Sequence, residues 1–228
     1  MPIDLSRVKA ICFDVDGTLS NTDDQFVQKL DSWLSPLRFA FRNRDVHKFA
    51  RKLVMFTEGP GNWAYNLADR IGLDGKIVAL GDRFYEMGIG KSTQPFQIIT
   101  GVREMLDNLH NHYPLGIISA RGQKSTYKFL YQFELLANFG AVATSQTCKH
   151  TKPYPEPLEW AAARLNVAVT SCLMVGDTVV DIITGKKAGA QTVGVLCGFG
   201  DKKELERAGA DLILHSTVDL EGYLLRRS

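Results

Sequence analysis

The chain has 228 residues, of which 45% are hydrophobic, and a formal net charge of +2. This length suits one core domain with an insertion or two small domains, and so small a charge gives no reason to expect nucleic-acid binding. No apolar stretch reaches the roughly 20 residues that cross a bilayer, and the N-terminus does not resemble a signal peptide, so we expect a cytoplasmic protein that does not bind membranes.

The first predicted element is a strand at Val8–Phe13, and acids, a glycine and a hydroxyl follow it directly. An apolar run without alternation is typical of a strand that is covered on both faces in a parallel sheet. Gly17 permits an abrupt turn, so Asp14 and Asp16 can converge on one point before Thr18. Two carboxylates this close repel each other unless a cation or a proton lies between them, and Mg²⁺ is the expected cation.

The Asp-x-Asp-Gly pattern also occurs in solvated turns and in Ca²⁺-binding loops. Its position directly after a buried strand is against both alternatives. A Ca²⁺ loop would also end in a glutamate, and Gln25 stands at that position.

Between residues 20 and 95 the hydrophobic pattern is helical. Apolar residues recur at helical spacing in four segments, and glycine-rich turn signals separate them. We therefore predict an inserted four-helix cap domain at 20–95.

From residue 96 to residue 228, strands and helices alternate. The predicted strands are Leu115–Ser119, Ala141–Thr144, Cys172–Val175, Thr192–Leu196 and Leu212–Leu214, and the predicted helices are 100–111, 123–136, 155–165, 178–188, 201–208 and one from Ser216. This order indicates an α/β fold with a doubly wound parallel sheet. The core domain should comprise residues 1–19 and 96–228, with the cap inserted over the site.

Polar residues follow three of these later segments. The strand at 115–119 ends in Ser119, Ala120 and Arg121, which can form an anion cradle although such loops are common. Lys152 opens a rigid proline-rich segment, which by itself could equally be a surface connection. The strand at 172–175 leads into Asp177 and Asp181, of which Asp177 could equally be a helix cap.

Taken together, strand ends that carry paired acids, a serine, a lysine and two further acids form the set needed for Mg²⁺-assisted phosphoryl transfer through an aspartyl-phosphate. The four cysteines lack metal-binding spacing and are expected to be free thiols, and the basic run at 38–52 is expected to be a solvated helical face.

At these residues the chain resembles the haloacid dehalogenase (HAD) superfamily of phosphohydrolases. Asp14-Val15-Asp16-Gly17-Thr18 is similar to the first motif, Ser119 to the second, Lys152 to the third, and Gly176-Asp177-Thr178 with Asp181 to the fourth. The inserted helical segment is similar to the cap of the subgroup that includes phosphoglycolate phosphatase.

The resemblance implies a role for each of these residues. Asp14 would attack phosphorus, and Asp16 would act first as a general acid and then as a general base. Mg²⁺ would bind Asp14, the Asp16 carbonyl and Asp177, with support from Asp181. The phosphoryl oxygens would bind Thr18, Ser119, Lys152 and the nearby groups of Gly17, Ala120 and Arg121.

Other chemistry within the superfamily stays open. The second acid, Asp16, disfavours a dehalogenase, because the dehalogenases of the superfamily lack it. A mutase is disfavoured because the cap turn Glu58–Trp63 contains no arginine of the kind found in the mutases. A phosphonatase is disfavoured because no cap lysine has a clearly apolar setting. Glu58, Asn62 and Trp63 are candidates for substrate contact, although they could equally cap helices.

The leading hypothesis is a Mg²⁺-dependent phosphomonoester hydrolase that acts on a small phosphorylated metabolite, such as a phosphoglycolate-like compound or a sugar phosphate. The enzyme would be a monomer or a homodimer. A phospho-acceptor signalling module also combines acids, a hydroxyl and a lysine, but it needs no cap of this size. An inactive scaffold is disfavoured by the intact acids.

Overall fold

The structure is a computed structural model that describes residues 3–21 and 96–225. The chain divides into two units, residues 1–23 with 96–228 and residues 24–95, and the described residues belong to the first. The predicted four-helix cap and its residues Glu58, Asn62 and Trp63 lie outside the described part. The boundaries of the predicted cap therefore stay a prediction.

Six parallel strands form one sheet in the order β3-β2-β1-β4-β5-β6. Their bounds are β1 Ala10–Phe13, β2 Leu115–Ile118, β3 Phe139–Ala143, β4 Cys172–Gly176, β5 Gln191–Val195 and β6 Leu212–Leu214. The order reverses beside β1, so that β2 and β4 flank it. This arrangement confirms the predicted doubly wound α/β sheet.

Alternate residues of β1 supply the two hydrophobic cores, one on each face of the sheet. Ile11 and Phe13 pack into the larger core, to which α4, α5 and α9 contribute. Ala10 and Cys12 pack into the second core together with α6. All four side chains are fully buried. The apolar run is unbroken because both faces of β1 are covered, as the sequence predicted.

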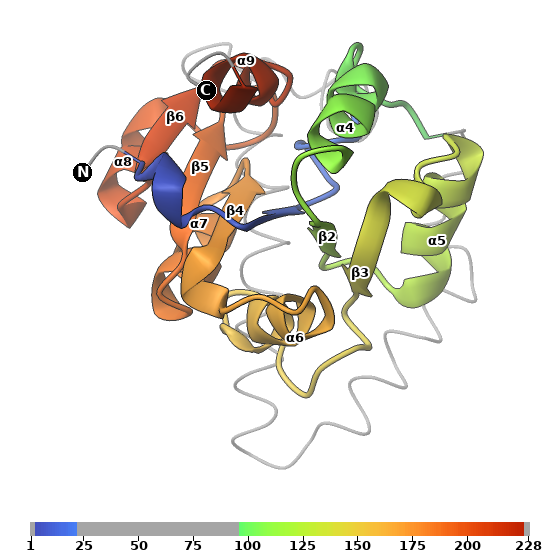
Figure 1. Ribbon diagram of the computed structural model, residues 1–228, viewed down its shortest axis with the longest axis horizontal. Helices are drawn as coiled ribbons and strands as arrows, with labels where there is room; N and C mark the ends of the chain where they lie inside the picture. The colour runs from blue at the N-terminus through green and yellow to red at the C-terminus, as the bar shows by residue number, and fades with distance from the viewer. Residues whose placement is uncertain (1–2, 22–95, 226–228) are drawn as a thin grey trace, which may run out of the picture. The chain divides into compact units, whose positions relative to one another are not determined.

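Helices cover both faces of this sheet, and Figure 1 shows α4 and α9 on one side of it and α6 on the other. The helices run over α4 Val102–His110, α5 Gln123–Gln132, α6 Glu156–Arg164, α7 Val179–Lys187, α8 Lys202–Ala208 and α9 Asp219–Leu225, with short 3-10 turns η1 Leu5–Arg7, η3 Leu136–Asn138 and η4 Val169–Ser171. In the described ranges, no helix combines the length and apolar character needed to span a membrane.

The predicted helix 123–136 is too long. The helix α5 ends at Gln132, and Glu134 has a φ of 55°, in the left-handed region that a helix cannot include. Leu135 and Leu136, which the predicted helix included, pack against the core from the turn that follows α5.

The two ends of the described chain that flank residues 22–95 are joined by backbone hydrogen bonds. The amide of Asn21 donates to the carbonyl of Gln97 at 2.9 Å, and the amide of Ile99 donates to Leu19 at 3.0 Å. Ser20 forms bridges with both Asp16 and Ile98. The chain therefore leaves and re-enters the core at one point, next to the end of β1.

Candidate active site

The carboxyl ends of three adjacent strands carry the candidate residues. Asp14 directly follows β1, Ser119 directly follows β2, and Asp177 directly follows β4. Because parallel strands end at the same edge, residues that are far apart in the sequence meet in one place.

Three buried acids form the centre of this site. Asp14, Asp177 and Asp181 each offer one carboxylate oxygen, and these oxygens lie within 4.8 Å of one another. The residues are 5%, 0% and 0% exposed. A group of this kind, made only of carboxylate oxygens, has the donor chemistry that Mg²⁺ prefers.

Lys152 joins two of these acids. Its Nζ lies 2.7 Å from Oδ1 of Asp14 and 2.6 Å from Oδ1 of Asp181, and the residue is buried. Burial alone would lower the pKa of Lys152, but the charges of Asp14 and Asp181 raise it above its ordinary value. The lysine is therefore held in its charged form between the two carboxylates.

One ammonium does not balance three buried carboxylates. The pKa of Asp14 is raised to about 8, chiefly by burial; Lys152 opposes this rise, and the charges of Asp181 and Asp16 add to it. Ionisation of all three carboxylates would therefore leave an excess of negative charge, which a divalent cation would compensate. The residues present fit such an ion.

Asp181 also fixes the start of α7. Its Oδ2 accepts hydrogen bonds from the amide of Thr178 at 3.0 Å and from the Thr178 hydroxyl at 2.7 Å, as part of a capping box. Asp181 therefore holds Lys152 on one side and the helix end on the other. The Thr-x-x-Asp spacing could have indicated this cap from the sequence.

Asp177 is held by groups from two loops. Its Oδ2 accepts from the amide of Phe199 at 2.8 Å, and its Oδ1 accepts from the hydroxyl of Thr18 at 3.2 Å. The Phe199 loop was not predicted to take part in the site. Its only signal was its position after β5, which ends at the same edge as β4.

Gly17 is required by this packing. Its φ is 71°, and a Cβ at this position would overlap the side chain of Asp177. Glycine therefore provides both the turn after β1 and the space for the acid.

A second ion pair lies beside the acid cluster. The Nε of Arg121 donates to Oδ2 of Asp16 at 2.6 Å, and Nη2 of Arg121 donates to Oδ1. Arg121 was predicted to bind phosphate, whereas here its guanidinium binds the Asp16 carboxylate. The carboxylate of Asp16 is not among the three acids of the cluster, and only its backbone carbonyl was predicted to bind metal.

The loop after β2 places the remaining predicted phosphate ligands. Ser119 is buried, and its Oγ accepts a hydrogen bond from the amide of Arg121 at 3.1 Å. Ala120, between them, is exposed. These residues lie at the same sheet edge as Asp14.

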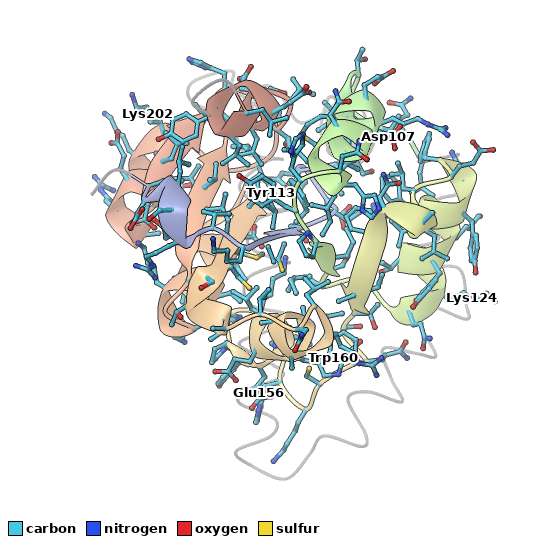
Figure 2. The ribbon with its side chains drawn as sticks, viewed as in Figure 1. Asp107, Tyr113, Lys124, Glu156, Trp160 and Lys202 are labelled. Carbon is cyan, nitrogen blue, oxygen red and sulfur yellow. The ribbon has the colours of Figure 1, made fainter. Side chains whose placement is uncertain are left out.

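The segment that carries Lys152 is fastened to α6. Glu156, labelled in Figure 2 at the start of that helix, accepts from the amide of His150 at 2.9 Å and contacts its Nδ1 at 2.7 Å. The hydrogen bond from the His150 side chain lowers the pKa of Glu156. This link and the prolines around it hold the lysine backbone in place.

Known proteins share both sequence and fold with this chain. A family model described as haloacid dehalogenase-like hydrolase matches residues 11–195. Over 214 residues the chain is 26% identical to the pyrophosphatase PpaX of Oceanobacillus iheyensis, with 93% of this chain and 95% of that protein covered.

Two solved structures share the fold. A protein of Clostridium acetobutylicum, described as a predicted phosphatase, has a TM-score of 0.70 at 22% identity and covers 96% of this chain and 99% of its own. A haloacid dehalogenase-like family hydrolase of Streptococcus pneumoniae has a TM-score of 0.69 at 20% identity, with coverage of 96% and 99%. The family match extends over most of the chain and includes the first and fourth motifs, and the chain therefore belongs to the haloacid dehalogenase-like hydrolases.

Proposed function

We propose that this hydrolase is a Mg²⁺-dependent phosphatase that acts on a small phosphorylated metabolite through an aspartyl-phosphate. The observation that carries the proposal is the group of three buried carboxylates with Lys152 bound to two of them. Phosphoryl transfer needs a carboxylate that can attack phosphorus, a fixed positive charge beside it and further carboxylates that can bind a divalent cation. This group of residues offers all three.

In the first step an oxygen of Asp14 bonds to phosphorus, and the bond from phosphorus to the leaving oxygen breaks with its electron pair. Asp16 gives its proton to that oxygen. In the second step the Asp16 carboxylate takes a proton from water, whose oxygen attacks phosphorus and releases Asp14. Lys152 stabilises the negative charge on the transferred group.

Asp14, Asp177 and the backbone carbonyl of Asp16 would hold the metal, with Asp181 in support. Mg²⁺ would neutralise charge on the carboxylates and on the phosphoryl group when bound. Ser119 and the amide of Ala120 are proposed to bind phosphoryl oxygens. Gly17 and Thr18, which were also predicted to do so, are engaged elsewhere: the Gly17 amide donates to the carbonyl of Ser20 at 3.0 Å, and the Thr18 hydroxyl donates to Asp177 at 3.2 Å.

The substrate class rests on the inserted segment. We propose that residues 20–95 form the helical cap and that Glu58, Asn62 and Trp63 contribute to specificity. A phosphoglycolate-like compound or a sugar phosphate is the first candidate.

Pyrophosphate is a second candidate. The relative from Oceanobacillus iheyensis is named a pyrophosphatase, and it aligns with 93% of this chain. The same attack by Asp14 would serve, with phosphate as the leaving group.

The test is phosphate release from p-nitrophenyl phosphate with and without Mg²⁺, in the wild type and in Asp14→Asn. Activity that needs Mg²⁺ and is lost in Asp14→Asn supports the proposal, whereas full activity in that variant overturns the mechanism. A panel with pyrophosphate, phosphoglycolate and sugar phosphates then ranks the substrates by kcat/KM.

A further inference from the structure

Arg121 and Asp16 form a two-point ion pair at the edge of the site. Nε of Arg121 lies 2.6 Å from Oδ2 of Asp16, and Nη2 pairs with Oδ1, so that two N–H groups of the planar guanidinium face both carboxylate oxygens. Their side chains are 12% and 21% exposed. A two-point contact fixes the direction of the carboxylate as well as its distance.

The guanidinium is itself held from other sides. Its central carbon lies 4.7 Å from the ring centroid of Phe96 and 5.8 Å from that of Phe129, within the range of cation–π attraction. The two rings meet edge to face at 5.9 Å. The ring contacts and the ion pair therefore support the guanidinium from different directions.

The backbone of Arg121 is fixed as well. Its amide donates to Oγ of Ser119 at 3.1 Å, and its carbonyl accepts from the amide of Ser145 at 3.0 Å. Arg121 therefore links the ends of β2 and β3 to the loop after β1.

We infer that Arg121 is a positioning residue, which aims the Asp16 carboxylate for the hydrolysis of the aspartyl-phosphate, and that it is not a ligand of the phosphoryl group. The inference rests on the proposed function and assigns the division of labour within the same site. In that step a water oxygen bonds to phosphorus, the bond from phosphorus to Asp14 breaks with its electron pair returning to the Asp14 carboxylate, and one water proton passes to Asp16.

The ionised Asp16 is the form that remains after the leaving group has taken its proton. A carboxylate that accepts one bond from Arg121 at each oxygen retains further lone pairs for a water proton. Arg121 thus fixes the direction of the Asp16 carboxylate and leaves it able to accept a proton from water in the second step.

The experiment compares the two steps in Arg121→Gln with p-nitrophenyl phosphate, whose good leaving group needs little help from an acid. Stopped-flow release of p-nitrophenolate gives the rate of phosphorylation. Intact-mass measurement after rapid quenching gives the decay of the phosphorylated protein. We expect the decay to slow by roughly 10- to 100-fold, with the rate of phosphorylation and the inhibition constant of inorganic phosphate changed by less than about 3-fold.

The reverse pattern would overturn the inference. A ligand of the phosphoryl group would show slower phosphorylation and weaker inhibition by inorganic phosphate. Equal slowing of both steps, or no change in either, would also overturn it.

A double variant tests whether Arg121 acts through Asp16. If it does, adding Arg121→Gln to Asp16→Asn slows decay no further, because the group that the arginine positions is already lost. If the fold reductions in decay rate of the two single variants multiply in the double variant, Arg121 acts independently of Asp16, and the inference is contradicted.

Two further variants separate this role from folding. Arg121→Lys keeps a positive charge near the two rings but loses the two-point contact, so it should show the same selective slowing of decay if Arg121→Gln does not fold. Arg103→Gln removes an exposed pair with Glu134, whose atoms lie 2.7 Å apart, and should leave both steps unchanged. If the wild type releases no phosphate from any ester, the proposed function fails, whereas the inference about Arg121 fails only in a protein that turns over.

Discussion

The Nζ of Lys152 lies 2.7 Å from Oδ1 of Asp14, and the two side chains are only 5% and 8% exposed. Asp181 is bound to the same ammonium at 2.6 Å. Removal of this lysine would leave two buried carboxylates without their cation.

Lys152→Met should therefore lower the free energy of unfolding by roughly 3–5 kcal/mol, because it leaves buried charges uncompensated. Urea denaturation monitored by circular dichroism measures this free energy of unfolding in the variant and in the wild type. Lys186→Met is the matched control, since Lys186 pairs with Asp211 at 2.5 Å but is 36% exposed, and a loss of about 1 kcal/mol is expected there. Equal losses in the two variants would show that burial does not set the strength of the Lys152 pairs.

Gly17→Ala should reduce activity as well as stability. The positive φ costs about 1–2 kcal/mol for an L-residue, and the added Cβ would also displace Asp177. The half-saturating concentration of Mg²⁺ in the phosphatase assay should rise by about 10-fold, as for a displaced ligand-supporting group.

Gly189→Ala separates the two effects. Gly189 has a φ of 75°, and a Cβ there would meet Thr170 at 3.4 Å, an ordinary contact. This control should lose stability with an unchanged Mg²⁺ requirement. A similar loss of Mg²⁺ response in both variants would contradict the explanation.

Thr18→Val should act on the metal site before it acts on substrate binding. The Thr18 hydroxyl donates to Oδ1 of Asp177 at 3.2 Å, so valine removes a bond that orients the acid while keeping the volume of the side chain. We expect the Mg²⁺ requirement to rise by about 10-fold at a nearly constant KM. A raised KM with an unchanged Mg²⁺ response would place the hydroxyl on the substrate.

The carboxylate of Asp211 should contribute to stability in a pH-dependent way. Burial alone would raise its pKa, but Lys186 and the amide and hydroxyl of Thr192 hold the pKa below the ordinary value of 3.8. The unfolded chain therefore binds this proton more readily than the folded protein does. The stabilisation is present above the ordinary pKa and is lost as the pH falls below it.

Asp211→Asn should remove this contribution. Thermal unfolding between pH 7 and pH 2.5 should show that the difference in Tm between the wild type and the variant becomes smaller as the pH falls. A difference in Tm that stays constant over this range would exclude the ionised carboxylate as its source.

Much of the fold could be predicted because each strand of the described core has a local signature. The strand at Leu212–Leu214 was predicted with its observed bounds, and β4 was predicted to within one residue of its end. The end of α5 could not be predicted, because Leu135 and Leu136 fit a helical pattern while Glu134 breaks it. Helix ends depend on packing that periodicity does not contain.

The site was predictable to the extent that it follows from strand ends. Asp14, Ser119 and Asp177 lie together because the strands before them are neighbours in a parallel sheet. The pairing of Arg121 with Asp16 was not predictable, because both residues were assigned to the phosphate and metal sites and no spacing rule connects them. The hydrogen bond from the Phe199 amide to Asp177 was not predictable either, because a backbone amide has no signature in a sequence.

The hydrogen bond from Asn21 to Gln97 has a consequence for how such a chain can change. The two flanks of residues 22–95 are already fastened to each other, so the entropy of closing the intervening stretch grows only slowly with its length. Substitution, shortening or replacement of that stretch would leave the pairing of the flanks and the sheet beneath them intact. The sheet edge that carries Asp14 and the inserted residues can therefore evolve at different rates, because the insertion can change while the sheet and its acids stay the same.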